Sequence, residues 1–498
     1  MCRWSSINRA TPRRVLAAAI VVVLVLLGPT PPAALARPTG PGGIPWAACP
    51  EDRTVQCGTL RAPADWANPY GPSIMLTIAR RPAADPARRI GALLVNPGGP
   101  GGSAVDFTFG ATTFFSAAIL QRFDIVGVDP RGVGRSSPVL CSQDLVDAKP
   151  DPLIETAAQY AATIDYNRRL AADCASRTGA HFGHVDTVSV ARDMDAVRTA
   201  LAEEQISFYG ASYGSMIGAE YAERYPSRLR AVVLDGVMDH SAGLASFLIQ
   251  ETAAAQDSFS EFVAWCGRDT KCVLRGRDIP AIWAGLMGRA RAGTLRNPYD
   301  KTIKLSPSGL AAAAFAAFYE PQWYSFAYYL RDAAGIAGRQ APPPAVDIVD
   351  HSFPAVICSD WYLPITGFPD LRRRLRILAG RAPQMLASPL ALSAVTGCLG
   401  WPSAPPDPQR ALVPPRGMAP VLLIGSRHDP ATSYAWARSV AGQLGDAGSL
   451  LTYEGWGHVV YNRSPCVAAA ADKYLVSLIR PAAGASCPGV EPSPFGVG

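Results

Sequence analysis

The stretch ISFYGASYGSMIGAEYAERYP, residues 206–226, decides the fold. Its first part, ISFYGAS, is a short and nearly continuous apolar run, which predicts a strand buried on both faces of a sheet. Residues 213–225 continue as a predicted helix, which Pro226 ends. The junction carries Gly210-Ala211-Ser212-Tyr213-Gly214, a G-x-S-x-G motif between strand and helix. The stretch therefore predicts a sharp turn with a serine at its apex.

The spacing of the two glycines has a physical cause. A serine on so sharp a turn has strained backbone angles, and side chains two positions to either side would collide. The turn pushes the Oγ of Ser212 out of the sheet and directs the Tyr213 N–H, at the helix N-terminus, toward developing negative charge. A purely structural Gly-Ser turn is the alternative. We interpret Ser212 as a nucleophile and the Tyr213 N–H as an oxyanion donor.

Further apolar runs, bounded by turn residues, lie on both sides of this motif. They are GTLRAPADW (58–66), SIMLTIAR (73–80), ALLVNPGG (92–99), FDIVGVDPRG (123–132), AVVLDG (231–236), VLLIGSRHD (421–429) and LLTYEGWGH (450–458). Helical patterns separate several of them, as in residues 188–203. Strands that alternate with helices predict an α/β fold with a mostly parallel sheet of about eight strands.

Residues 240–415 break this alternation. They are rich in alanine, proline and aromatic residues and are too long for a loop. We predict a mainly helical cap domain here, inserted after the sixth strand. The core then comprises residues 37–239 and 416–498, the latter with a C-terminal tail.

A glycine-rich segment, NPGGPGG at 96–102, follows the predicted strand ALLV. It lacks the Lys-Ser/Thr of a P-loop and the spacing of a dinucleotide fingerprint. Glycine lets backbone approach a substrate closely, so we assign the second oxyanion N–H to Gly99, with Gly98 as the alternative. A plain surface turn is the other interpretation.

An acid and a base follow the two late strands. The expected chain order is nucleophile, acid, then histidine, which points to Asp429 and His458. His458 is the histidine placed after the last predicted strand, whereas His428 is interpreted as a neighbour of the acid. Asp235, after the strand AVVL, is an alternative acid, although a local backbone hydrogen bond would also explain it.

The N-terminus predicts export. Four arginines and an apolar core precede the small-residue site Ala34-Leu35-Ala36, so we predict a signal peptide at 1–36 that is cleaved after Ala36. An uncleaved anchor is the alternative, but the apolar run is shorter than a spanning helix requires. The predicted location is secreted or associated with the cell envelope, with no stable membrane insertion after cleavage.

The charge balance argues against nucleic acid as a partner. The whole chain carries 46 basic and 40 acidic side chains, and the four arginines before residue 37 reduce the mature excess to about two. A polyanion-binding protein needs a basic stripe, and the sequence has none.

Ten of the eleven cysteines remain after signal cleavage, an even number that suits an oxidising compartment. No C-x-x-C pair or histidine-rich tract indicates a metal, and no cofactor is predicted. Neighbour pairing is the simplest connectivity, although sequence alone does not fix it. The pairs would be Cys49–Cys57, Cys141–Cys174, Cys266–Cys272, Cys358–Cys398 and Cys466–Cys487.

Together these motifs resemble the tripeptidyl aminopeptidase-like branch of the prolyl aminopeptidase family, secreted actinobacterial serine exopeptidases of the α/β-hydrolase fold. The resembling stretches are VNPGGPGGSAVDF (from Val95), FDIVGVDPRGVGRSSPVLC (from Phe123), YGASYGSMIGAEYAERYPSRLRAVVLDGV (from Tyr209), ICSDW (from Ile357), DPATSY (from Asp429) and GHVVYNRSPC (from Gly457). The resemblance implies release of single residues or short peptides from free N-termini, and its nucleophile, acid and base fall on Ser212, Asp429 and His458.

Two other functions stay open. A carboxylesterase or lipase would use the same triad, and a non-catalytic cell-surface binding protein would use the scaffold alone. An aminopeptidase must recognise a free ammonium group, best through a carboxylate. We single out Asp360, in the resembling motif ICSDW, with a structural hydrogen bond as the alternative. The other cap acids considered are Glu251, Asp257, Glu261, Glu320, Asp332 and Asp350.

Overall fold

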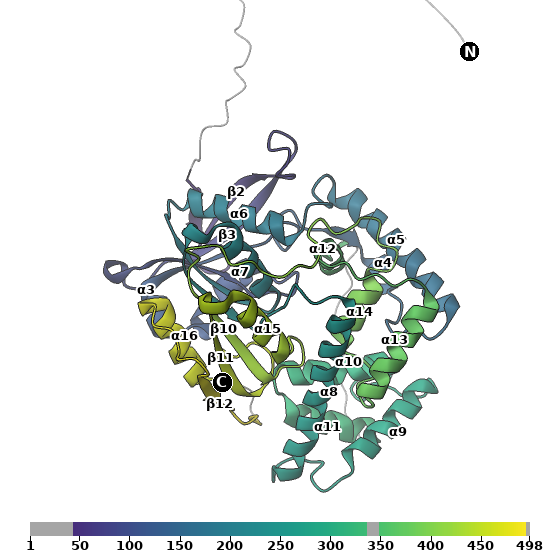
Figure 1. The fold of residues 1–498 in the computed structure, drawn as a ribbon. Coiled ribbons are helices and arrows are strands. Elements are labelled where there is room, and N and C mark those ends of the chain that lie inside the picture. The colour runs from purple at the N-terminus through teal and green to yellow at the C-terminus, as the bar shows by residue number, and fades with distance from the viewer. Residues whose placement is uncertain (1–42, 336–347, 495–498) are drawn as a thin grey trace, which may run out of the picture. The chain divides into compact units, whose positions relative to one another are not determined.

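The computed structural model describes residues 43–335 and 348–494, and its centre is a ten-stranded sheet (Figure 1). The strand order is β1-β2-β3-β5-β4-β7-β8-β10-β11-β12. The strands of this sheet are β1 (Ala47–Ala48), β2 (Gln56–Pro63), β3 (Ser73–Arg81), β4 (Gly91–Asn96), β5 (Phe123–Val128), β7 (Ile206–Ala211), β8 (Leu229–Asp235), β10 (Val421–His428), β11 (Gly448–Trp456) and β12 (Ser486–Pro488).

The sheet is mostly parallel. Pairings β1–β2, β2–β3 and β3–β5 are antiparallel, and every pairing from β5 to β12 is parallel. All residues of β4, β5 and β7 are buried, as the continuous apolar runs predict. The predicted fold class is thus confirmed. The two strands beyond the predicted eight are the short edge strands β1, of two residues, and β12, of three.

Helices separate the strands and fill the long insertion before β10. They are α1 (Ala104–Phe109), α2 (Ala111–Phe114), α3 (Ala117–Arg122), α4 (Gln143–Asp147), α5 (Ala157–Thr178), α6 (Thr187–Ala200), α7 (Tyr213–Arg224), α8 (Leu244–Arg268), α9 (Ile279–Arg291), α10 (Pro307–Tyr319), α11 (Trp323–Ala333), α12 (Phe353–Asp360), α13 (Phe368–Arg381), α14 (Pro389–Gly397), α15 (Tyr434–Leu444) and α16 (Pro465–Ser477).

Alternate residues of each core strand point to opposite faces of the sheet, and a separate apolar cluster covers each face. Leu94 and Phe208 belong to the cluster that includes α6, α7 and α15. Their chain neighbours Leu93 and Tyr209 belong to the cluster that includes α3 and α16. The period of two along each strand therefore produces a three-layer architecture.

The insertion between β8 and β10 carries α8 to α14 and the short strand β9 (Ile348–Asp350), which pairs with β6 (Leu140–Ser142). Its own apolar cluster is rich in aromatic side chains, among them Phe262, Trp265 and Trp323. Other parts of the insertion, such as Phe247 on α8 and Ile357 on α12, pack into the sheet cluster. The cap boundaries at residues 240 and 415 therefore stay a prediction.

Five disulfides join consecutive cysteines of the described chain. They are Cys49–Cys57, Cys141–Cys174, Cys266–Cys272, Cys358–Cys398 and Cys466–Cys487. This number of disulfides is typical of proteins outside the reducing cytoplasm. In the described ranges, no helix combines the length and apolar character needed to cross a bilayer. The predicted signal peptide, residues 1–36, lies outside the described residues.

Candidate active site

Ser212 stands at the turn between β7 and α7. Its φ of 56° is positive, which is uncommon for a residue with a side chain, and its N–H donates to the carbonyl of Asp235 at 2.8 Å. A Cβ on Gly210 would lie 2.3 Å from the carbonyl oxygen of Gly214, and one on Gly214 would lie 2.7 Å from that of Asn96. At both positions a side chain would collide with backbone, which is the reason predicted from the sequence for the spacing of the two glycines.

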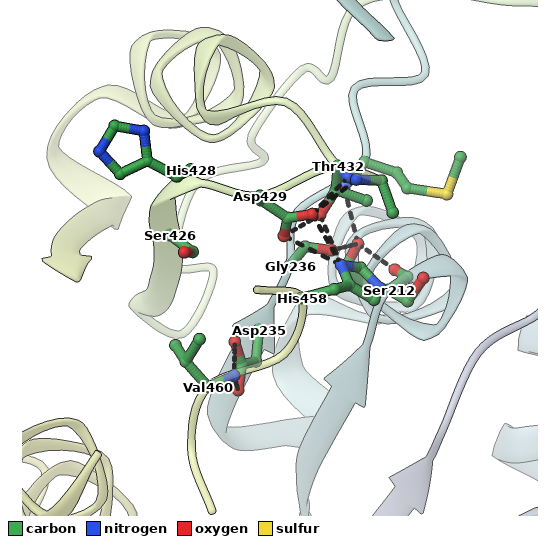
Figure 2. Close-up of polar contacts among 12 residues, drawn as sticks. Ser212, Asp235, Gly236, Ser426, His428, Asp429, Thr432, His458 and Val460 are labelled. Carbon is green, nitrogen blue, oxygen red and sulfur yellow. Dashed lines mark hydrogen bonds and ion pairs between the residues drawn. The ribbon is translucent and has the colours of Figure 1, made fainter. Parts of the chain in front are cut away.

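The imidazole of His458 lies against the carboxylate of Asp429 (Figure 2). Nδ1 is 2.9 Å from Oδ2 and 3.1 Å from Oδ1, and both side chains are almost fully buried. The carboxylate also accepts the N–H groups of Ala431 (2.8 Å) and Thr432 (2.9 Å) and the Thr432 hydroxyl (2.9 Å). These bonds fix the acid, which in turn fixes Nδ1 as the N–H nitrogen and leaves Nε2 available as a base.

Nε2 of His458 is buried and has no hydrogen-bond partner within the described chain. Ser212 and His458 line the same cavity, of about 620 Å³. The structure thus brings together the three residues proposed from the order of the motifs. Ser212 and His458 face one cavity, and Asp429 contacts the imidazole of His458 at Nδ1.

The glycine-rich segment 96–102 lies directly against the serine turn. A Cβ on Gly98 would be 2.4 Å from the carbonyl oxygen of Ala211, and Gly98 and Gly99 have φ of 85° and 117°. The Gly98 N–H donates to Asn96 Oδ1 at 2.8 Å, whereas the Gly99 N–H has no such partner among the described residues. Both glycines line the cavity, so this difference favours Gly99 as the oxyanion donor together with the Tyr213 N–H.

The two alternative residues have other partners. Asp235 accepts the N–H groups of Val460 and Tyr461 and the hydroxyl of Tyr209, and its burial raises its pKa. Figure 2 shows its carboxylate at the Val460 backbone, apart from the imidazole that Asp429 contacts. His428 contacts Asp257, with Nδ1 at 2.7 Å from Oδ2. The structure therefore places Asp429, and not Asp235, at Nδ1 of His458.

Asp360 lies elsewhere. It is fully buried at the end of α12 and does not line the cavity. Its carboxyl accepts the Thr187 N–H (2.8 Å), the Thr187 hydroxyl (2.9 Å) and the Tyr213 hydroxyl. Burial, partly offset by these bonds, raises its pKa to about 8. Asp360 as an ammonium ligand stays a prediction, while the alternative, a structural hydrogen bond, matches the contacts of its carboxyl.

Four polar residues to which the sequence assigned no catalytic role also line the cavity: Tyr319, Glu320, Asn462 and Arg463. The carbonyl of Tyr319 accepts the backbone N–H of His458 at 2.8 Å, and the two rings meet edge to face at 4.6 Å. Burial raises the pKa of the Tyr319 hydroxyl, and a side-chain hydrogen bond with Ser212 offsets part of that rise. The insertion thus touches both the nucleophile and the base.

One group among the described residues has the spacing of a metal site: Asp257, Glu261 and His428, whose donor atoms lie within 4.8 Å of one another. Each already has a protein partner, since Asp257 pairs with His428 and Glu261 accepts the indole N–H of Trp456. These contacts explain the group as an ion pair between α8 and the end of β10.

Comparison with known proteins agrees with this architecture. The model of the α/β hydrolase fold family matches residues 91–462. The chain is 30% identical over 470 residues to a protein named Serine protease Hip1 of Mycobacterium tuberculosis (86% of this chain, 87% of the relative). It is 33% identical over 476 residues to Carboxylesterase B of the same organism (88% and 87%). It is 28% identical over 464 residues to a Tripeptidyl aminopeptidase of Streptomyces coelicolor (87% and 84%). The chain therefore belongs to the α/β-hydrolase-fold family.

Proposed function

We propose that this chain is a secreted serine exopeptidase of the tripeptidyl aminopeptidase-like branch. It would release single residues, dipeptides or tripeptides from free N-termini through an acyl-enzyme. One observation carries the serine-hydrolase part of the proposal: Ser212 and His458 share a cavity of about 620 Å³, and Asp429 holds Nδ1 of the imidazole at 2.9 Å.

The first half of the reaction forms the acyl-enzyme. Ser212 Oγ attacks the scissile carbonyl carbon while Nε2 of His458 takes the hydroxyl proton. Asp429 keeps the proton on Nδ1 and stabilises the imidazolium. The N–H groups of Gly99 and Tyr213 donate to the oxyanion of the tetrahedral intermediate. The intermediate collapses when the C–N bond breaks and His458 gives its proton to the leaving amine.

The second half releases the product. A water molecule takes the place of the leaving amine, His458 accepts one of its protons, and the resulting hydroxide attacks the ester carbonyl. The same N–H groups hold the second oxyanion. Collapse returns the proton from His458 to Ser212 Oγ and frees the carboxylic acid product.

The polar groups of the cavity favour a peptide over a lipid ester. Glu320, at the end of α10, and Arg463 both line the cavity that holds Ser212. Glu320 is exposed there, so its carboxylate is the group that we assign to the substrate ammonium in place of Asp360. The insertion supplies Glu320, and exopeptidase selectivity would therefore depend on the predicted cap.

A carboxylesterase is the second candidate, because the relative named Carboxylesterase B is as similar to this chain as the relative named as a protease. The triad serves esters equally well. A non-catalytic binding protein is disfavoured, since it needs neither the buried Asp429–His458 pair nor a strained Ser212.

Export is part of the same proposal. Five disulfides suit an oxidising compartment, and the predicted signal at 1–36 would direct the chain there.

The test is a substrate panel with a matched serine pair. Chromogenic di- and tripeptides with free and with acetylated N-termini are compared with short-chain and long-chain esters. An exopeptidase should cleave free-amine peptides with the highest kcat/KM. Ser212→Ala should lower kcat by about 10⁴- to 10⁶-fold. Ser207→Ala, which removes from β7 a buried hydroxyl without a hydrogen-bond partner among the described residues, should retain the wild-type kcat. If esters were hydrolysed with a higher kcat/KM than every peptide, the exopeptidase proposal would be wrong and the carboxylesterase would take its place.

A further inference from the structure

Arg463 is a buried cation at the active-site cavity. It lies between His458 and α16, and only 8% of its surface is exposed. It lines the cavity of Ser212 and also a neighbouring cavity of about 280 Å³, bounded in part by Gln322 and Glu491. Glu320 lines both cavities as well, so these two charged side chains stand where the cavities adjoin.

The guanidinium of Arg463 forms no ion pair with the part of the chain that the structure describes. Nη1 donates to the carbonyl of Trp456 at 3.0 Å, and Nε is buried without any hydrogen bond. No carboxylate oxygen of residues 43–335 and 348–494 lies within the 4.0 Å of an ion pair with it, and the charges of Glu320, Asp235 and Asp429 raise its pKa only from a longer distance. Burial lowers the pKa of this guanidinium below its usual value, but an arginine remains charged in proteins. A charge removed from water without a partner is energetically costly.

Arg131 shows how this fold stabilises a buried arginine that has a structural role. It has no exposed surface, and it binds Asp193 through two hydrogen bonds of 2.6 and 2.7 Å. The carbonyls of Pro63, Ala64 and His184 accept its remaining N–H groups. Arg463 has a single carbonyl in place of this complete set. Its unused donors at a cavity wall are what a site for an external anion requires.

We infer that Arg463 binds a carboxylate of the substrate beside the nucleophile. The inference rests on the proposed function and names its substrate class: short acyl compounds that carry a free carboxylate. Asn462, exposed on the same wall, offers an additional amide donor. With Glu320 nearby, the cavity presents one anionic and one cationic group that do not form an ion pair with each other, a combination that suits a zwitterionic peptide.

The carboxylate has two chemical sources. It is either the C-terminus of a short peptide, on the leaving-group side of the scissile bond, or an acidic group on the acyl side. The guanidinium fork binds both in the same bidentate way. If the carboxylate is the C-terminus, Arg463 would make the enzyme prefer short peptides over long protein chains. If it is an acidic group on the acyl side, Arg463 would not distinguish the two.

The first experiment uses the unaltered enzyme. Tetrapeptides that end in a free carboxylate are compared with the same peptides ending in an amide, which have the same shape without the charge. The acyl side is tested with p-nitrophenyl hemisuccinate against p-nitrophenyl valerate. One of the two acid substrates should have a kcat/KM higher than its neutral partner by on the order of 10- to 100-fold. Ratios near one for both pairs would overturn the inference, whatever the variants do.

The second experiment removes the charge. Arg463→Gln should reduce the acid-to-neutral ratio toward one, mainly through KM of the acid substrate, and Arg463→Lys should keep part of the ratio. The matched control is Arg230→Gln, because Arg230 also donates only to carbonyls among the described residues, those of Leu475 and Val476, and does not line the cavity. An unchanged ratio in Arg463→Gln would refute the assignment, as would an equal loss on both members of a pair.

Failure of this inference differs from failure of the proposed function. If peptides are not cleaved but esters are, the exopeptidase is refuted while the ester pair still measures the preference for a carboxylate. If peptides are cleaved without any preference for a carboxylate, the exopeptidase stands, and Arg463 is a structural support of the loop that carries His458.

Discussion

The carboxylate of Asp235 accepts the backbone N–H of Val460 at 3.0 Å, two residues beyond His458. The next N–H, of Tyr461, donates to the same oxygen at 2.9 Å. The last residue of β8 therefore holds the loop that carries the proposed base, while Asp429 contacts the imidazole itself. Two buried acids at neighbouring strand ends thus have different tasks, one on the backbone and one on the ring.

This division predicts opposite phenotypes for two conservative substitutions. Asp429→Asn should lower kcat by about 10⁴-fold with little change in Tm, because the imidazole loses the acceptor that fixes its tautomer. Asp235→Asn should cost about 1–3 kcal/mol of unfolding free energy, since one backbone N–H then faces an amide donor, and should lower kcat far less. Urea unfolding and steady-state kinetics on both proteins measure this. If Asp235→Asn were the catalytically dead variant, the two assignments would have to be exchanged.

Gly236 predicts a steric effect on the base. Its φ is +71°, and a Cβ there would lie 2.9 Å from Cε1 of His458 and 3.1 Å from Oγ1 of Thr432. Gly236→Ala should displace the imidazole and lower kcat by on the order of 10²-fold, the size expected for a misplacement of about 1 Å. The left-handed backbone itself costs an alanine about 1–2 kcal/mol of stability.

Gly417→Ala is the matched control for this substitution. Gly417 has a similar φ of +77°, and a Cβ there would have no atom within 4 Å. It should show the same order of destabilisation with an unchanged kcat. If Gly236→Ala and Gly417→Ala had the same kcat, the contact of the new Cβ with His458 would have no effect on catalysis.

Asp360 predicts a pH dependence of stability. Its folded-state pKa of about 8 exceeds the usual 3.8, so the folded protein retains a proton that the unfolded chain has lost. The unfolding free energy contributed by this group is complete below about pH 4 and declines as the pH rises toward 8. Asp360→Asn, which keeps a neutral side chain at all pH values, should flatten the decline and be relatively more stable at pH 8 than at pH 5.

Thermal unfolding of both proteins between pH 4 and 9 measures this effect. If stability fell with pH equally steeply in both proteins, the protonation of Asp360 would not be the cause of the pH dependence. Kinetics on the same variant test the role predicted from sequence: a rise in KM confined to free-amine peptides would identify Asp360, and not Glu320, as the ammonium ligand.

The triad candidates could be found from sequence because the strand topology largely determines which residues lie close together. Parallel strands bring their carboxyl ends to one edge, so residues after 211, 428 and 456 are near neighbours once the strands are recognised. Arg463 lay within the motif GHVVYNRSPC, but only its burial without a carboxylate makes it notable. Glu320 was one of seven cap acids considered, and nothing in the sequence distinguished it or Tyr319, because the packing of the end of α10 on the His458 loop is tertiary. The hydrogen-bond partners of Asp360 could not be found from sequence, because Thr187 and Tyr213 lie far from it along the chain.

The last prediction concerns the disulfide between Cys358 on α12 and Cys398 after α14. It closes a loop of 40 residues, whereas Cys266–Cys272 closes one of 6. In the chain-entropy description, a cross-link restricts the unfolded chain more when the loop is longer, by about 4 kcal/mol for the first bridge against about 2 kcal/mol for the second. Replacing both cysteines of a pair by serine avoids a free thiol. The Cys358→Ser/Cys398→Ser protein should therefore lose more unfolding free energy in urea than the Cys266→Ser/Cys272→Ser protein. The reverse order would mean that local packing, and not loop closure, sets the contribution of each bridge.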